Sequence, residues 1–188
     1  TGSVNVSVGT DSLKSNTTGS SNTAIGQASL EVNTTASFNT GVGRNALALT
    51  TTGHSNTAVG YNSLVANTTG AGNTAIGIGA LGAETTGANN VIIGQAGQAQ
   101  TLTSDTVAVG DGALQTNTKS AKNTAIGRSA LRNLNHTSAT DAYNTALGFN
   151  AGLAVTTGVQ NVLIGGEAGD ALTDADFNVA MGVSALGS

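Results

Sequence analysis

The sequence predicts an all-β fold, a parallel β-roll or β-solenoid of about 11 coils with a 17-residue repeat. The first observation is the segment N-[TV]-A-[IV]-G, which recurs along the whole chain. Its closing glycines are 17 residues apart, with one interval of 16 and one of 21, and they are Gly9, Gly26, Gly43, Gly60, Gly77, Gly94, Gly110, Gly127, Gly148, Gly165 and Gly182. Residues 1–188 are therefore expected to form a single repeat array without a domain boundary.

Composition is the second observation. Only 3% of residues are aromatic and 9% are charged, whereas 27 are glycine, so a thick globular core is not expected. Every unit contains glycine and a run of threonine and asparagine, which are poor helix formers. Coils of short strands fit this composition better than helices do.

The N-T-A-I-G segment is expected to be a short strand, in which the second and fourth positions share one face. The fourth position is always Ile, Val, Leu or Met, and we expect it to point into the core, as at Ile25, Val59, Ile76, Ile126 and Ile164. The third position is usually Ala, which suits a face pressed against a close neighbour.

The second half of the unit supplies another expected core residue, a leucine at Leu13, Leu30, Leu47, Leu64, Leu81, Leu114, Leu131 and Leu186. Where Gln98 or Gly169 replaces it, the same unit has a bulkier strand, Val91–Ile93 or Val162–Ile164. The larger strand residues are therefore expected to fill the core volume that the missing leucine side chain leaves. At a third exception, Gly152, Leu153 is the candidate replacement.

Glycines mark two corners of each coil. A glycine in the same phase of all 11 units predicts a positive φ or a backbone too close to allow a Cβ. The second corner tolerates residues other than glycine. In three of the units without glycine there, an aromatic residue lies just before the next strand, and we expect Phe38, Tyr143 and Phe177 to cover the corner. Asparagine begins every expected strand except one, where Thr106 replaces it. This recurring asparagine predicts a ladder of amide hydrogen bonds along the axis.

The units NTAIGQASL, NTAVGYNSL and NTAIGRSAL resemble the repeats of YadA-like trimeric autotransporter adhesin heads. The longer form with TTG between units resembles repeats in bacteriophage tail fibres and related bacterial surface proteins. The resemblance covers essentially the whole chain and implies a left-handed β-roll that forms a homotrimer. The chain departs from the adhesin pattern in its 17-residue coil and shows no stalk heptads or membrane anchor.

A partner is also expected on physical grounds. One coil holds about two or three core side chains, which is little against a backbone-ordering cost of roughly 1 to 2 kcal/mol per residue. Small alanine side chains would let neighbouring rolls approach closely. The chain begins and ends in mid-pattern, at Thr1-Gly2 and Ala185–Ser188, so we expect a segment of a longer fibre or chains that stack end to end.

Charge argues against two classes of partner. A net charge of -4 and a pI near 4.8 give no attraction to nucleic acid or to anionic lipid. No apolar run is long enough for membrane insertion, and the absence of cysteine removes thiolate metal sites. No cofactor is expected.

Catalytic and metal-binding candidates are weak. The two histidines, His54 in a turn and His136 in the longest loop, have no evident catalytic partners. The acidic group Glu167, Asp170, Asp174 and Asp176 offers oxygen ligands but lacks the spacing of known calcium motifs, so a solvated acidic edge is the alternative. We therefore expect a protein that is not an enzyme.

The 21-residue unit predicts a loop within residues 133–143 that stands out from the shaft. His136, Asp141 and Tyr143 lie in it, and four of the six basic residues are in or next to it: Lys119, Lys122, Arg128 and Arg132. The loop is either a tolerated insertion with solvated charges or a contact site for a receptor.

Three functions are compatible with these observations. The leading one is a structural or adhesive fibre segment, extracellular, from a phage tail fibre or a bacterial surface filament, with a cell-surface receptor or glycan as partner. The second is ice binding, because threonine is abundant, although adjacent Thr-Thr side chains point to opposite faces of a strand. The third is a glycan-cleaving fibre, which would need paired carboxylates.

Overall fold

The computed structural model describes residues 2–187 and shows an all-β solenoid, which confirms the predicted fold class. No helix occurs among these residues. Eleven strands, one per coil, form a single sheet: β1 (Val6–Val8), β2 (Thr23–Ile25), β3 (Thr40–Val42), β4 (Thr57–Val59), β5 (Thr74–Ile76), β6 (Val91–Ile93), β7 (Val107–Val109), β9 (Thr124–Ile126), β11 (Thr145–Leu147), β12 (Val162–Ile164) and β13 (Val179–Met181). Thr1 and Ser188, in the two interrupted units, lie outside the described residues.

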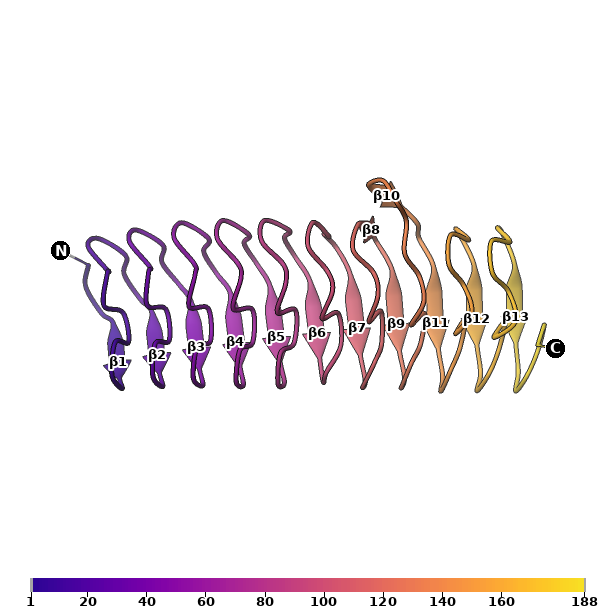
Figure 1. The fold of residues 1–188 in the computed structure, drawn as a ribbon, viewed down its shortest axis with the longest axis horizontal. Helices are drawn as coiled ribbons and strands as arrows, with labels where there is room; N and C mark the ends of the chain where they lie inside the picture. Colours follow the sequence, from indigo (N-terminus) through magenta and orange to yellow (C-terminus); the bar gives the residue numbers. More distant parts are fainter. Residues whose placement is uncertain (1, 188) are drawn as a thin grey trace.

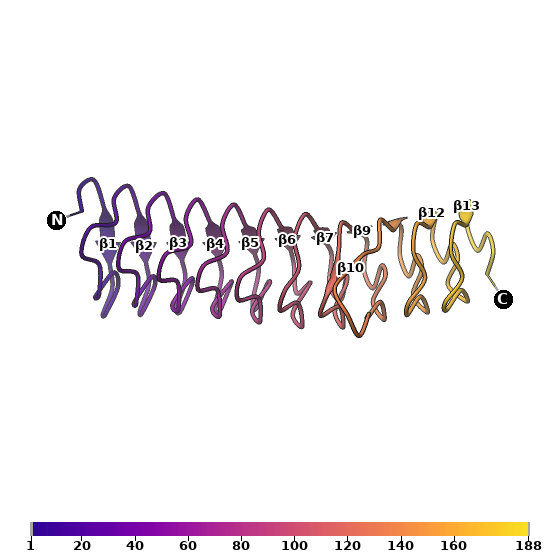
Figure 2. The ribbon, with the colours of Figure 1, turned by 90° about the horizontal axis from the view of Figure 1, so that it is seen from above.

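The coils follow one another along a straight axis, with the two ends of the chain at opposite ends of the molecule (Figures 1 and 2). All strand pairs are parallel and in register, so that Thr23 pairs with Thr40 and Thr40 with Thr57. The irregular coils keep this register, since Val91 pairs with Val107 and Thr124 with Thr145. Extra or missing residues are absorbed outside the sheet.

The four added residues of the 21-residue coil form the expected projection. Its short strand β10 (Thr140–Asp141) pairs with β8 (Ser120–Ala121) in a separate two-stranded sheet. Figure 1 shows β10 standing above the line of the other coils.

The expected orientation of the strands is wrong. The middle residue of the strand points inward, and Ala24, Ala58, Ala75, Ala108, Ala125 and Ala146 are completely buried. The flanking residues point outward, and Ile25, Ile76 and Ile126 are 40%, 38% and 37% exposed, while Val59 and Ile164 are partly exposed. The physical reason is the thinness of the coil, because the opposite wall already fills the interior.

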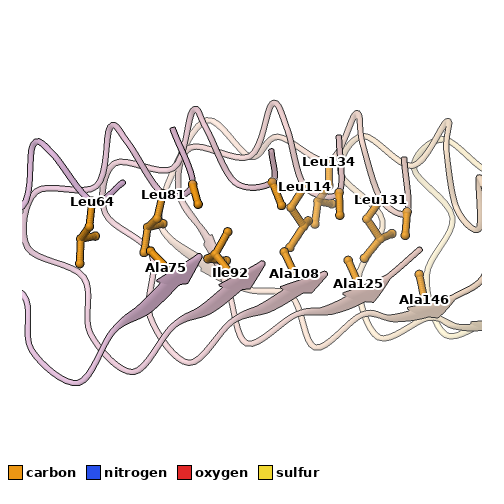
Figure 3. Packing of buried hydrophobic residues seen from close by; sticks show 14 of the residues in the cluster. Leu64, Ala75, Leu81, Ile92, Ala108, Leu114, Ala125, Leu131, Leu134 and Ala146 are labelled. Atoms are coloured by element: carbon orange, nitrogen blue, oxygen red, sulfur yellow. The ribbon is translucent and has the colours of Figure 1, made fainter. Parts of the chain in front are cut away.

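That opposite wall supplies the leucines, whose core role is confirmed. Leu30, Leu47, Leu64, Leu81, Leu114 and Leu131 are completely buried, and Figure 3 shows leucines facing the alanines of the sheet across the core. In the first and last coils Leu13 is partly buried and Leu186 is 52% exposed. Alanine is therefore the strand residue that fits opposite leucine at native packing density.

The sequence predicts that Gln98 occupies the leucine position of the 16-residue coil. In the structure Gly97 occupies this position. The Leu81 backbone N–H donates to Ala96 O and the Gly97 N–H to Ala113 O, which continues the pattern of the leucine positions. The expected restoration of volume does occur, because Ile92 replaces alanine at the inward strand position and is completely buried. Figure 3 shows Ile92 pointing into the core between Leu81 and Leu114.

One leucine fills the gaps at both remaining exceptions. A Cβ on Gly152 would lie 2.7 Å from Leu163 Cδ1, and a Cβ on Gly169 would lie 2.7 Å from Leu163 Cδ2. Leu163 is an inward strand residue and is completely buried. The sequence predicts that Leu153 replaces the core leucine that is missing at Gly152, but Leu153 is only partly buried. The core volume is thus restored by the same unit at Gly169 and by the neighbouring unit at Gly152.

The asparagine ladder is confirmed. The backbone N–H of Asn73 donates to Asn56 Oδ1 at 2.9 Å, and that of Asn90 donates to Asn73 Oδ1 at 3.0 Å. In most coils the Nδ2 donates to the corner carbonyl that precedes the next strand, as from Asn73 to Gly87 O at 2.9 Å. The ladder therefore joins the start of one strand to the start of the next, except between Thr106 and Asn123, where threonine replaces asparagine.

We expect Asn90→Ala to lower the free energy of unfolding by about 2 kcal/mol, because it leaves buried backbone groups unpaired. Asn90 is completely buried; its Oδ1 accepts from the Thr106 N–H at 3.1 Å and its Nδ2 donates to Thr103 O at 2.9 Å. Denaturant unfolding measures the effect. The control is Asn89→Gly, at an exposed neighbour with a φ of 59°. Equal stability of the two variants would contradict the ladder's role.

Candidate functional site

The largest candidate site is the outer face of the 11-stranded sheet, formed by the first and third residues of its strands. We call it the outer sheet face. The first residues are Thr or Val, and the third residues are Ile, Val, Leu or Met. In-register pairing arranges them in two parallel rows along the whole axis. The rows are regular because every coil repeats the same strand.

No first or third residue of these strands is charged. Val91 is 36% exposed, Ile93 37% and Leu147 46%. The third residues of the strands, all Ile, Val, Leu or Met, form a continuous row that we call the apolar stripe. Scattered exposed apolar residues are ordinary on protein surfaces, but a continuous stripe marks an interaction surface. Sequence reasoning missed this stripe because it had assigned the larger strand residues to the core.

The projecting loop is the second candidate, and its centre is Lys122. Its Nζ donates to Asp141 Oδ2 at 2.7 Å and to the Tyr143 hydroxyl at 3.1 Å, and lies 5.2 Å from the centre of the Tyr143 ring. The hydrogen bond to the Asp141 carboxylate, followed by that to Tyr143, raises the pKa of Lys122 above its ordinary value. The cluster joins the loop to the preceding coil.

The three residues predicted in this loop have different surroundings. Asp141 and Tyr143 are exposed, whereas His136 is only 9% exposed and its Nε2 lies 2.9 Å from Thr157 O of the next coil. His136 therefore anchors the base of the loop. The surface that a receptor would meet is formed by Asp141 and Tyr143 with Lys122.

Two further cations lie over aromatic rings. Arg44 is 5.8 Å from the centre of the Tyr61 ring, and Arg128 is 5.9 Å from that of Phe149. In each pair the residues follow successive corner glycines, so neighbouring coils bring them together. Comparing equivalent positions in adjacent repeats would have found both pairs.

The acidic candidates make separate contacts. Asp174 Oδ1 lies 3.2 Å from Thr173 Oγ1, and Asp176 Oδ1 accepts from the Val159 N–H at 2.7 Å. Asp170 is partly buried. Among residues 2–187, no group of three or more His, Cys, Asp or Glu side chains is placed to hold a metal ion.

One buried carboxylate was not anticipated. Glu84 is completely buried, and its Oε1 accepts from the N–H groups of Thr85, Thr86 and Gly87 at 3.0, 3.1 and 2.7 Å. Its Oε2 accepts from the Thr103 N–H at 2.9 Å. In several other coils asparagine occupies this position and holds the same turn, as Asn67 does through Gly70 O at 3.1 Å. Glu84 is therefore a structural residue of the turn.

No protein-family model, curated protein or solved structure matches this chain. Within residues 2–187 there is also no helix with the length and apolarity needed to cross a membrane.

Proposed function

We propose that the chain is a rigid segment of an extracellular fibre, in which three copies pack side by side through their outer sheet faces. The observation that supports this most strongly is the uncharged apolar stripe, which continues over all eleven strands. A stripe of this length would be a liability on a free monomer. A second copy has the same stripe with the same spacing, so chains of this kind are complementary to one another.

The likeness of the repeats to YadA-like adhesin heads and phage tail fibres is part of this proposal. It favours three copies over two, and it favours a phage tail fibre or a bacterial cell surface as the location. The shaft would be long, stiff and unreactive, with attachment at projecting loops such as the one around Lys122. A cell-surface receptor or a glycan is the partner we propose.

A charge introduced on the outer sheet face tests the interface. We expect Ile76→Asp to convert the trimer to monomers at micromolar concentration, because three carboxylates would be brought together in an apolar contact. The matched control is Ile78→Asp, since Ile78 is 59% exposed and follows the corner glycine outside the sheet. Its position is occupied by Asp111 in another coil. Sedimentation velocity measures both masses.

The proposal fails if Ile76→Asp and Ile78→Asp assemble equally well. It also fails if the control alone dissociates, because the contact would then lie beside the corner glycines.

One observation keeps ice binding as a second candidate. One row on the outer sheet face contains four successive threonines, Thr23, Thr40, Thr57 and Thr74. The prediction from sequence rests on adjacent Thr-Thr pairs alone and does not anticipate this row. The row is broken by Val91 and Val107, and the parallel row is apolar. An ice recrystallisation assay tests this candidate, and we expect no inhibition because the face is covered in the trimer.

We also propose that the chain has no catalytic activity. A glycan-release assay on bacterial surface polysaccharide is expected to yield no soluble fragments. Release of sugars by the purified chain would contradict this expectation.

A further inference from the structure

A surface depression lies between the third and fourth coils, at the turns that precede β3 and β4. It has a volume of about 440 Å³ and is lined by residues 35–38 of one turn and by Thr52, His54 and Ser55 of the next. It lies before the strands begin, and so outside the outer sheet face. Neither the projecting loop nor the basic residues around it contribute to this depression.

The apolar wall of the depression is Phe38. The sequence predicted that this ring would cover the corner, but it is 66% exposed. The same coil position is occupied by Ser21 in the coil before and by Ser55 and Gly72 in the two coils after. These small residues leave the ring uncovered along the axis.

Polar groups face the same space from both turns. His54 Nδ1 lies 3.2 Å from Ser55 Oγ. Ser37 Oγ accepts the Ser20 N–H at 3.0 Å, so its own hydroxyl proton remains free to donate. The lining residues include no Asp, Glu, Lys or Arg. The depression therefore combines one aromatic ring with hydroxyl and imidazole groups and no fixed charge.

We propose that this depression binds a single pyranose ring of a neutral glycan. The C–H face of a sugar ring is weakly positive and packs against the negative face of an aromatic ring, here Phe38. The sugar hydroxyls then exchange hydrogen bonds with His54, Ser55 and Ser37, which gives the few directional polar contacts typical of a small-molecule site. An anionic ligand would find no cation here, and a purely apolar one would leave the polar groups unpaired.

This inference deepens the proposed attachment role by naming a ligand class and a place on the shaft. Two other aromatic residues have the same coil position and provide an internal comparison. Phe177 is 70% exposed, yet Asp176 stands beside it where Ser37 stands beside Phe38. Tyr143 is bound to Lys122 through its hydroxyl. Only Phe38 of the three has both a free ring face and neutral polar neighbours.

Saturation-transfer NMR with methyl glycosides of glucose, galactose and N-acetylglucosamine tests the proposal on the full chain. We expect transfer to the ring protons of at least one glycoside, with a dissociation constant on the order of 1 mM, as expected for a single sugar in a shallow site. Phe38→Ser should weaken binding about tenfold or more, and His54→Ser several-fold. Both substitutions introduce a residue that other coils have at that position, so folding is preserved.

Phe177→Ser is the matched control and should leave binding unchanged. Absence of transfer from all three glycosides would overturn the proposal, and so would equal binding by wild type and Phe38→Ser. The test is independent of assembly. A trimer that binds no glycoside refutes this site and leaves the fibre proposal standing, whereas a monomer that binds through Phe38 refutes the fibre and supports the site.

Discussion

Replacing Ala75 by aspartate is expected to lower the free energy of unfolding by about 4 kcal/mol. Ala75 is completely buried at the inward strand position. In Figure 3 it points into the core near Leu81. A carboxylate there would have no partner and no room, because the leucine wall already fills the interior. Denaturant unfolding at a fixed chain concentration measures the loss.

The adjacent residue is the control for orientation. Ile76 is 38% exposed, so we expect Ile76→Asp to keep the β-sheet circular dichroism of the wild type even though its assembly is lost. If Ile76→Asp unfolded the chain and Ala75→Asp did not, the strands would have the opposite orientation. This pair therefore distinguishes core residues from interface residues at one point of the sheet.

The second large effect is expected at a corner glycine. Gly60 has a φ of 133°, which other residues rarely adopt, and a Cβ there would lie 2.4 Å from Gly77 O of the next coil. Gly60→Ala would therefore impose backbone strain and separate two coils, at an expected cost of about 3 kcal/mol. Thermal unfolding followed by circular dichroism measures this cost.

Gly166→Ala is the matched control, because a Cβ at Gly166 would meet nothing within 4 Å. It should change stability by less than about 0.5 kcal/mol. A wild-type melting temperature for Gly60→Ala would show that the coils are not stacked as closely as the structure indicates.

The repeat and its corners were predictable because they depend on local backbone requirements. A glycine in constant phase indicated a conformation that only glycine adopts, and the corner glycines do have positive φ, such as 128° at Gly26 and 135° at Gly43. The leucine wall and the asparagine ladder were predictable for the same reason. Each is one residue type in one position of the coil.

The orientation of the strands was not predictable from size and polarity alone. The rule that larger apolar residues point inward assumes a core wide enough to hold them. Here the coil is so thin that Ala24 faces the leucine wall, and Ile25 is left outside. A signal was present, since two of the three units that lack the leucine have Ile92 or Leu163 in place of alanine. That exchange of volume identifies the middle strand residue as the core residue.

The binding surfaces were predictable only in part. The length of one repeat located the projecting loop, but the burial of His136 depends on its contact with Thr157 in the next coil. The depression beside Phe38 depends on small residues at the same position of the two adjacent coils, Ser21 and Ser55. Neighbours along the axis are 17 residues apart in sequence, so such sites become visible only when the coils are stacked.

The central claim, that the outer sheet face joins three chains, is tested most directly by the mass of the wild-type chain in solution. Sedimentation equilibrium at micromolar concentration, on a sample with β-sheet circular dichroism, is expected to give three times the chain mass of 18.2 kDa. A folded chain that sediments as a single 18.2 kDa species would contradict both the shared interface and the fibre proposal.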